Sequence, residues 1–226
     1  MNGAVIVAAG RSERMGAIVK PWAPLADASG RERPLLAYPI VAFQSCAAVD
    51  RIALVVAADA VERARALVRD ETFDKVCSAV AGGARRQDSV RCGLEALGAC
   101  DYVAVHDGAR PLVTPALIER GFEAARASGA ACCAIPAPDT VKEAEGGRVV
   151  RTLDRSRLWL AQTPQVFRYD LLVDAHSRLE SDVTDDAALV EALGIEVRLF
   201  EGSSRNLKVT TPDDLALVQA LLKETM

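Results

Sequence analysis

The stretch that decides the fold is AVIVAAGRSERMG, residues 4–16. An apolar run of strand length, residues 4–9, ends at Gly10 and is followed by a short loop that carries Arg11 and Arg14. Many nucleotide-binding α/β folds begin with a buried strand that breaks at a glycine into such a loop. The chemistry of the protein therefore depends on which kind of phosphate site this loop forms.

Two common phosphate-binding motifs do not fit the residues of this loop. A dinucleotide fingerprint needs the pattern G-x-G-x-x-G, and Ser12 stands at the second glycine position. A P-loop needs Gly-Lys-Ser/Thr, but Ala17 follows Gly16. What remains is a loop of backbone amides with basic side chains, followed by Lys20, which could bind a polyphosphate. A surface loop with solvated arginines is the alternative interpretation.

Apolar runs alternate with helical patterns along most of the chain. We expect strands at 3–9, 51–57, 76–81, 101–106, 130–136 and 195–200. We expect helices at 35–47, 59–70, 87–97, 114–128, 169–178 and 185–193, and a last one that opens at Thr211-Pro212. Several strand patterns are continuously apolar, as in strands that are covered on both faces. The sequence thus predicts an α/β protein with a doubly wound, mostly parallel sheet in one domain over residues 1–226.

Residues 137–160 interrupt this alternation. Two short β-like pieces flank Glu145-Gly146-Gly147, a pattern that predicts a hairpin arm projecting from the sheet. A two-stranded hairpin alone is only marginally stable in water. We therefore expect the arm to pack against a partner.

Composition limits the classes of function. The 226 residues are 50% hydrophobic but only 4% aromatic, so we expect a core of Ala, Val and Leu. The net charge of −4 argues against nucleic-acid or membrane-surface binding, and no apolar run reaches the roughly 18 residues of a membrane span. The start of the chain has no signal-peptide pattern, and the six cysteines lack CxxC spacing. We expect a cytoplasmic protein with buried, reduced thiols.

Two further loops follow predicted strands and should meet the first loop at one edge of the sheet. In residues 82–89, Gly82 and Gly83 would let the backbone approach a ligand, and the Ser89 hydroxyl could read a base or ribose. An ordinary turn capped by Asp88 or Ser89 is the alternative.

The other loop, residues 106–111, places Asp107 at a strand end, where a carboxylate suits a metal or a ligand hydroxyl. We interpret His106 as hydrogen-bonded into the strand end rather than as a base. Lysines are scarce, five against twenty-two arginines, and two of them, Lys20 and Lys208, lie in loops. In a chain that uses arginine for most of its positive charge, a lysine in a loop indicates a site that needs a compact ammonium charge.

Taken together, eight segments resemble the 2-C-methyl-D-erythritol 4-phosphate cytidylyltransferases of the non-mevalonate isoprenoid pathway. In chain order they are AAGRSERMG, Lys20-Pro21, GGARRQDSV, HDGARP, PAPDTVKE, TLDRSRLWLAQTPQVF, VTDDAALVEALG and EGSSRNLKVTTPDDL. They extend from residue 8 to residue 215. The resemblance implies a Rossmann-like nucleotidyltransferase that joins CTP to this polyol phosphate and releases pyrophosphate.

The resemblance also implies roles for residues. The nucleotide would contact Ala8, Ala9, Gly10, Ser12, Gly83, Ala84, Ser89 and Gly108. The second substrate would be bound by Asp107, Arg110, Thr140 and Thr163. The catalytic residues would be Arg14, Lys20, Arg155 and Lys208. Arg14 and Lys20 would stabilise the transition state at the α-phosphate, and Lys208 and Arg155 would hold the second substrate.

The same resemblance implies a homodimer, in which the arm supplies Thr140 and Arg155 to the partner's site. Mg²⁺ would be held mainly by the CTP phosphates, with no metal ligands from the protein. Residues 20–36 are longer than the usual turn of the family, and Pro21-Trp22 replaces a Gln-aromatic pair, so the resemblance does not fix the path of this segment.

Three other functions compete with this interpretation. A cytidylyltransferase for ribitol 5-phosphate shares most of the loops, and Thr140, Arg155 and Thr163 favour methylerythritol phosphate over it. A non-catalytic nucleotide sensor on the same scaffold is disfavoured because the expected cations are present. A dinucleotide-dependent oxidoreductase is disfavoured by the missing glycine pattern.

Overall fold

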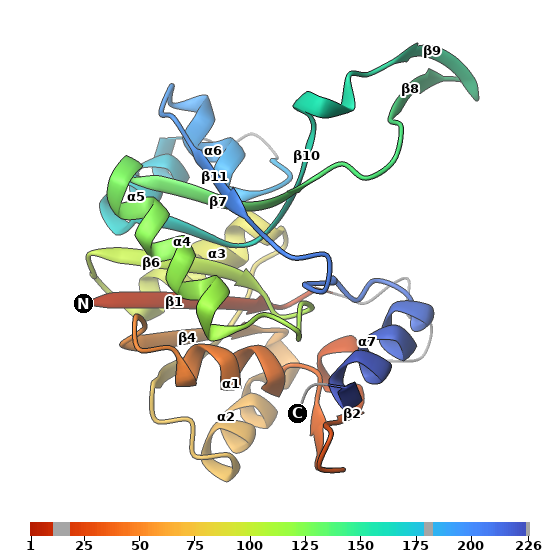
Figure 1. Cartoon of the computed structure of the whole chain (residues 1–226). Helices are drawn as coiled ribbons and strands as arrows, with labels where there is room; N and C mark the ends of the chain where they lie inside the picture. The colour runs from red at the N-terminus through yellow and green to blue at the C-terminus, as the bar shows by residue number, and fades with distance from the viewer. Residues whose placement is uncertain (11–18, 179–182, 225–226) are drawn as a thin grey trace.

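The computed structural model describes residues 1–10, 19–178 and 183–224. In this part of the chain, seven strands form the central sheet in the order β11-β7-β10-β6-β1-β4-β5 (Figure 1). Their bounds are β1 Asn2–Ala8, β4 Arg51–Val56, β5 Val76–Ala81, β6 Tyr102–Asp107, β7 Ala130–Pro136, β10 Trp159–Arg168 and β11 Arg198–Glu201. The pairs are parallel except those of β10, which runs antiparallel to β6 and β7. The predicted fold class is confirmed.

Helices cover both faces of the sheet. Their bounds are α1 Ala37–Ser45, α2 Val61–Asp70, α3 Arg86–Leu97, α4 Pro115–Ser128, α5 Tyr169–Arg178, α6 Asp186–Ala192 and α7 Pro212–Glu224. Short 3₁₀ turns lie at η2 Lys20–Trp22, η3 Ala58–Ala60 and η4 Arg155–Arg157. None of the described helices has both the length and the apolar character needed to cross a bilayer.

The central strand β1 shows why both faces are covered. Ala4 and Ile6 pack with α1, α2 and α4 on one face, whereas Val5 packs with α3, α5 and α6 on the other. All three side chains are fully buried. Because successive side chains of a strand point to opposite faces, an uninterrupted apolar run satisfies both layers. Because β1, β4, β5 and β6 pair in parallel, the carboxyl ends of β1, β5 and β6 lie at one edge of the sheet.

The sequence did not predict β10, which lies between β6 and β7. Its middle carries Gln162, Thr163 and Gln165, which have no apolar pattern, and its pairing with β7 shifts register between Ala161 and Gln165. The three polar side chains are nevertheless at most 7% exposed. Hydrogen bonds to neighbouring segments compensate these side chains for the loss of contact with water.

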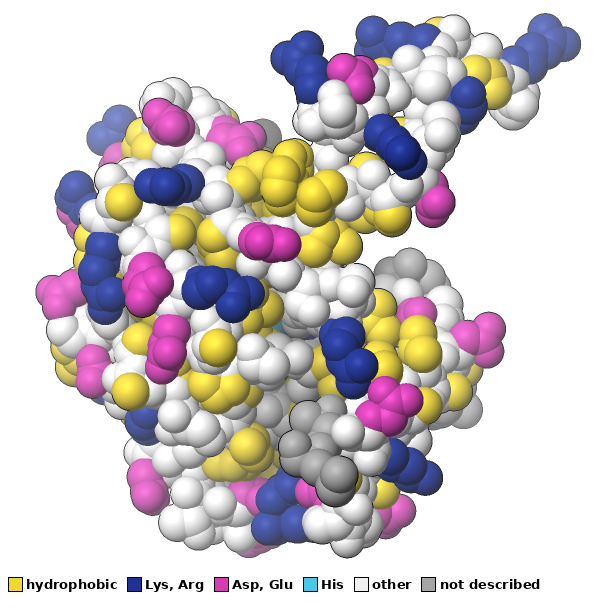
Figure 2. Space-filling model, viewed as in Figure 1, with side chains coloured by type: hydrophobic (Ala, Val, Ile, Leu, Met, Phe, Trp, Pro, Cys, Tyr) yellow, Lys and Arg dark blue, Asp and Glu magenta, His cyan; other side chains and the backbone are white. Residues whose placement is uncertain are grey.

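The predicted hairpin arm is present. β8 Lys142–Glu145 pairs antiparallel with β9 Arg148–Thr152, and Gly146 and Gly147 make the turn at φ of +54° and +78°. Every residue of both strands is exposed, and the arm projects away from the sheet (Figure 1). Figure 2 shows basic and hydrophobic side chains side by side along it.

The long segment after Lys20 folds into a second hairpin. β2 Pro24–Ala26 pairs antiparallel with β3 Glu32–Pro34 and lies beside α7 (Figure 1). Leu25 and Leu35 join Val209, Val218 and Leu222 in a small separate core, the α7 cluster.

The expectation that all cysteines are buried was wrong in part. Cys46, Cys132 and Cys133 are buried, but Cys77 is exposed, and Cys92 and Cys100 are intermediate. Cys77 lies on β5, one of the two edge strands of the described sheet. A strand at the edge leaves part of its side-chain surface uncovered.

Candidate functional site

A cavity opens where β1, β6 and the start of α3 meet. Ten of the residues predicted for the site line it, and they are Ala8, Ala9, Gly10, Lys20, Gly83, Ala84, Ser89, Asp107, Gly108 and Lys208. They come from five separate segments of the chain. Of the remaining predicted residues, Ser12 and Arg14 lie outside the described residues.

Glycines let the loops pack against the end of β1. A Cβ on Gly82 would lie 2.4 Å from the Cβ of Ala9, and one on Gly108 would lie 3.0 Å from the Cβ of Ala8. At Gly10, by contrast, a Cβ would meet no described atom within 4 Å. Packing against Ala9 and Ala8 thus explains Gly82 and Gly108, whereas no contact with a described residue explains Gly10, which lines the cavity.

The loop before α3 is ordered by its own side chains. Ser89 Oγ accepts a hydrogen bond from the Gly83 amide at 3.2 Å and donates one to the Arg85 carbonyl at 3.1 Å. Asp88 accepts from the Arg85 amide at 3.1 Å, as a helix cap does. The hydrogen bond from the Arg85 side chain also lowers the pKa of Asp88 to about 2. The turn is therefore capped, as the alternative interpretation expected, and it also lines the cavity.

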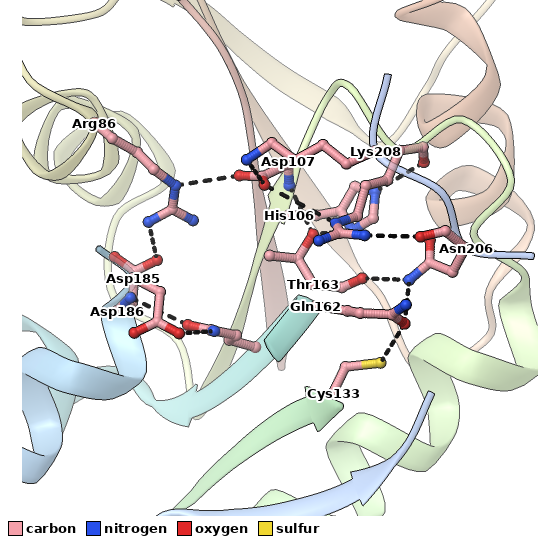
Figure 3. Close-up of polar contacts among 12 residues, drawn as sticks. Arg86, His106, Asp107, Cys133, Gln162, Thr163, Asp185, Asp186, Asn206 and Lys208 are labelled. Atoms are coloured by element: carbon pink, nitrogen blue, oxygen red, sulfur yellow. Dashed lines mark hydrogen bonds and ion pairs between the residues drawn. The ribbon is translucent and has the colours of Figure 1, made fainter. Parts of the chain in front are cut away.

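The Asp107 carboxylate is the centre of the polar contacts (Figure 3). Arg86 Nε donates to Oδ1 at 3.1 Å, Lys208 Nζ lies 2.7 Å from Oδ2, and Arg110 Nε lies 4.0 Å from Oδ2. Burial raises the pKa of Asp107, but the charges of Arg86, Lys208 and Arg110 outweigh this effect and hold it well below its usual range. Asp107 is therefore ionised at neutral pH.

Arg86 connects Asp107 to the start of α6. Its Nη1 lies 2.7 Å from Oδ2 of Asp186, which is completely buried, and His176 Nε2 lies 3.5 Å from Oδ1 of the same carboxylate. Burial raises the pKa of Asp186, but the charge of Arg86 overcomes this and lowers it. Sequence reasoning missed both Arg86 and Asp186. Nothing in the sequence distinguishes Arg86 from Arg85, which pairs with Asp88.

Thr163 and His106 support Asp107 from behind. The Asp107 amide donates to Thr163 Oγ1 at 3.0 Å, and this oxygen is hydrogen-bonded to His106 Nδ1 at 3.1 Å. His106 Nε2 lies 3.2 Å from the Arg110 carbonyl. Burial lowers the pKa of His106 to about 4, so the ring is neutral at pH 7. His106 is thus hydrogen-bonded at the strand end, as expected, and the Thr163 hydroxyl is already bound within the protein.

Lys208 is held by the loop that precedes it. Arg110 Nη1 donates to the Asn206 carbonyl at 2.7 Å, and Asn206 Nδ2 donates to the Thr163 carbonyl at 2.8 Å. Gln162 Nε2 donates to the Ser203 carbonyl at 3.0 Å. Arg110 is 9% exposed and binds this loop rather than lining the cavity.

The two predicted residues of the arm lie apart from this cavity. Thr140 and Arg155 are exposed, and Arg155 Nη1 donates to the Pro138 carbonyl at 2.8 Å. Neither side chain lines the cavity of its own chain.

Within the described ranges, no group of three or more His, Cys, Asp or Glu side chains could hold a metal ion. The Asp107 carboxylate faces the cavity, but Arg86 and Lys208 already bind it. A cation at this site would therefore take most of its ligands from a bound molecule.

Comparisons with known proteins agree on one family. The family model described as 2-C-methyl-D-erythritol 4-phosphate cytidylyltransferase (IspD) matches residues 3–224. The enzyme of that name from Dehalococcoides mccartyi (strain CBDB1) is 48% identical over 98% of this chain and 96% of its own length.

Two solved structures share the fold over nearly the whole chain. The 4-diphosphocytidyl-2C-methyl-D-erythritol synthase from Anaerococcus prevotii DSM 20548 superposes with a TM-score of 0.84 at 28% identity, covering 98% of this chain and 96% of that one. The 2-C-methyl-D-erythritol 4-phosphate cytidylyltransferase from Thermus thermophilus gives 0.78 at 34% identity, covering 96% of both chains.

Replacing Asp186 by Asn should destabilise the protein in a pH-dependent way. The variant removes one of the two buried carboxylates that pair with Arg86, so the free energy of unfolding at pH 7 should fall by about 3 kcal/mol, the lower end of the range for breaking a buried ion pair. Because the folded-state pKa of Asp186 is lowered, the wild-type contribution is present above pH ~4 and is lost as the pH falls below it. Urea unfolding at pH 7 and pH 3 should show the difference between wild type and variant narrowing at pH 3.

Asp170→Asn is the control, because Asp170 forms an exposed pair with Arg168 and should leave the free energy of unfolding nearly unchanged. A loss in Asp186→Asn that is equally large at both pH values would contradict the assigned ionisation.

Proposed function

The chain belongs to the 2-C-methyl-D-erythritol 4-phosphate cytidylyltransferase family, and on this premise we propose that its two substrates react in the cavity between β1, β6 and α3. The enzyme joins CTP and 2-C-methyl-D-erythritol 4-phosphate to give 4-diphosphocytidyl-2-C-methyl-D-erythritol and pyrophosphate, a step of isoprenoid precursor biosynthesis. The observation that carries the proposed location is that ten predicted residues from five chain segments converge on this cavity. We also propose that residues 1–226 form one domain, with the arm at 137–160.

The backbone around the cavity suits a nucleotide. Residues 8–10 at the end of β1 and the loop from Gly83 to Ala84 line it with main-chain atoms. Close to a helix N-terminus, backbone amides bind phosphate or base oxygens without a net protein charge. The triphosphate would lie along residues 8–10, Ser12 and Lys20, and the cytidine part would contact the loop that Ser89 orders and Gly108.

The reaction needs charge stabilisation more than proton transfer. A phosphate oxygen of methylerythritol phosphate attacks the α-phosphorus of CTP, a new P–O bond forms, and the bond to pyrophosphate breaks. The attacking phosphate is already anionic, so no base is required. Positioning of the substrates and fixed cations then supply most of the rate enhancement over the uncatalysed reaction. Arg14 and Lys20 would face the reacting α-phosphate, with the role of Arg14 resting on the resemblance of its loop.

Asp107 and Lys208 define the other end of the cavity. The ammonium group of Lys208 lies 2.7 Å from Asp107, which fixes its position while leaving it at the cavity wall. Lys208 would bind the phosphate of the second substrate, and Asp107 would accept from a polyol hydroxyl. Arg110 and Thr163 would act mainly through Asp107 and the loop of Lys208, since their polar groups bind those segments.

The residues present fit a Mg²⁺ ion that arrives with CTP. Mg²⁺ prefers oxygen ligands and commonly keeps several waters, so phosphate oxygens can supply most of its coordination. Since Arg86 and Lys208 occupy the Asp107 carboxylate, the protein would contribute few ligands. When bound, the ion would neutralise triphosphate charge and orient the chain of phosphates.

We further propose a homodimer that exchanges its arms. Val149 and Val150 on β9 are 61% and 57% exposed, and Trp159 near the base of the arm is 43% exposed. Such side chains gain from contact with another surface. A second copy is the partner that also gives Thr140 and Arg155 a substrate to bind. The six free cysteines suit the reducing cytoplasm, where we place the enzyme.

Pyrophosphate release tests the acceptor directly. CTP with Mg²⁺ and methylerythritol phosphate should release pyrophosphate much faster than CTP with Mg²⁺ and ribitol 5-phosphate, because Thr140, Arg155 and Thr163 match the family that uses the former. Release with ribitol 5-phosphate alone would move the assignment to that acceptor. No release with either acceptor would favour a nucleotide sensor.

Loss of a transition-state cation should lower turnover without unfolding the chain. Lys20→Ala and Arg14→Ala should each reduce kcat by roughly 10²–10³-fold, the scale of losing one donor to a developing anion. The measurement is steady-state kinetics with circular dichroism of each variant. Arg126→Ala, at an exposed position of α4, is the control. Near-normal turnover in both variants would overturn the assignment.

Mixing two inactive variants tests arm exchange. In a heterodimer of Lys20→Ala with Arg155→Ala subunits, one site would have its own Lys20 and receive an intact Arg155 from the partner. Random assortment should restore about a quarter of wild-type activity, because half of the dimers are mixed and each carries one complete site. If Arg155 served its own subunit, mixing would restore no activity.

A further inference from the structure

The two lysines of the cavity are attached to one small core. Lys208 immediately precedes Val209, and Lys20 begins the η2 turn that leads into β2 and Leu25. Val209 and Leu25 both belong to the α7 cluster, where they are 0% and 1% exposed. This cluster lies apart from the two helix layers of the central sheet (Figure 1). The relative position of the lysines therefore depends on how the β2–β3 hairpin sits on α7.

The turn that carries Lys20 is joined closely to the hairpin. The Ala23 amide donates to the Lys20 carbonyl at 3.1 Å, and the Leu36 amide donates to the Pro21 carbonyl at 3.0 Å. The Leu35 amide donates to the Ala23 carbonyl at 2.8 Å. A shift of the hairpin would thus be transmitted to Lys20.

Gln219 binds the outer edge of β2 in the manner of a neighbouring strand. Its side-chain Oε1 accepts from the Ala26 amide at 2.8 Å, and its Nε2 donates to the Ala26 carbonyl at 2.7 Å. One side chain of α7 thereby satisfies both main-chain groups of Ala26. The two hydrogen bonds fix β2 along its own direction, which apolar packing between Leu25 and Val218 does not do, because dispersion contacts have little directionality.

The opposite side of the hairpin is held by α2. Arg33 of β3 pairs at 3.0 Å with Glu71, the residue that follows α2, and at 3.2 Å with Asp27 of the hairpin itself, and Arg63 of α2 lies over the ring of Trp22 in η2 at 4.3 Å. The hairpin is thus fixed between α2 and α7, and Gln219 provides the polar contact on the α7 side.

We propose that Gln219 is a positioning residue for cytidylyl transfer, which holds β2 and thereby sets the position of Lys20 in the cavity. This inference rests on the proposed role of Lys20 in the reaction. Gln219 touches neither substrate, so its effect must pass through the β2–β3 hairpin. Charge stabilisation of a transition state depends on where the charged group lies. A displacement of this group by about 1 Å can therefore lower the rate by up to ~100-fold.

A double-mutant cycle separates positioning from simple stability. Gln219→Ala removes both hydrogen bonds, and Gln219→Met does so while keeping the length of the side chain. Each should lower kcat about tenfold at a temperature well below unfolding, within the range expected for small misplacements. The KM for CTP should change less than twofold, because the 83–89 loop and residues 8–10 keep their contacts and Lys20 is proposed to act mainly on the transition state. In the Lys20→Ala background the same substitutions should change kcat by less than twofold.

Lys223→Ala is the matched control, since Lys223 is an exposed residue one turn further along α7. It should leave kcat unchanged. If both Gln219 variants keep the wild-type kcat while Lys20→Ala is slow, the positioning role of Gln219 is overturned and the proposed role of Lys20 stands. An equal loss in the wild-type and Lys20→Ala backgrounds would also overturn it. Near-normal turnover of Lys20→Ala would overturn the proposed role of Lys20 and this inference with it.

Discussion

The ion pairs of one carboxylate hold the site together. Asp107 binds Arg86 with one oxygen and Lys208 with the other, while its amide donates to Thr163. Through these contacts a residue at the end of β6 connects the start of α3, the middle of β10 and the loop before α7. A buried carboxylate is costly unless it is paired, and three cations oppose that cost here. The arrangement gives Lys208 a fixed place at the cavity wall rather than a free surface position.

The site divides its work between backbone and side chains. Residues 8–10 and the glycine loop offer main-chain groups, for which shape and closeness matter more than residue type. The cations come from other segments, with Lys20 on the η2 turn and Lys208 beyond Asn206. Both lysines are attached to the small core formed by the β2–β3 hairpin and α7, apart from the strand and the glycine loop that supply the main-chain groups.

Periodicity and topology together predicted, from the sequence, most strands of the central sheet and the loops that meet at one of its edges. Continuous apolar runs indicated the parallel strands, and the rule that ligands bind beyond strand ends brought Gly83 and Asp107 to one edge. The strand β10 was missed because Gln162, Thr163 and Gln165 are buried to make hydrogen bonds, which a hydrophobic pattern does not register. The path of residues 20–36 was open because this segment departs from the usual turn of the family, and because β2 and β3, of three residues each, are too short to show a period.

Arg85 and Arg86 show a further limit of prediction from the sequence. Both follow the same glycines, yet one pairs with Asp88 on its own helix and the other binds Asp107 and Asp186 from two distant segments. Only the three-dimensional arrangement distinguishes them, because the two partners of Arg86 are 21 and 100 residues away along the chain.

The most direct test of this account is a crystal structure of the chain with CTP and Mg²⁺. It should place the triphosphate along residues 8–10 and Lys20, with the cytidine part against Gly83, Ala84 and Ser89 and with Asp107 still bound to Arg86 and Lys208. CTP bound instead in the groove between α3 and α5, which Tyr169 and His176 line, would contradict it.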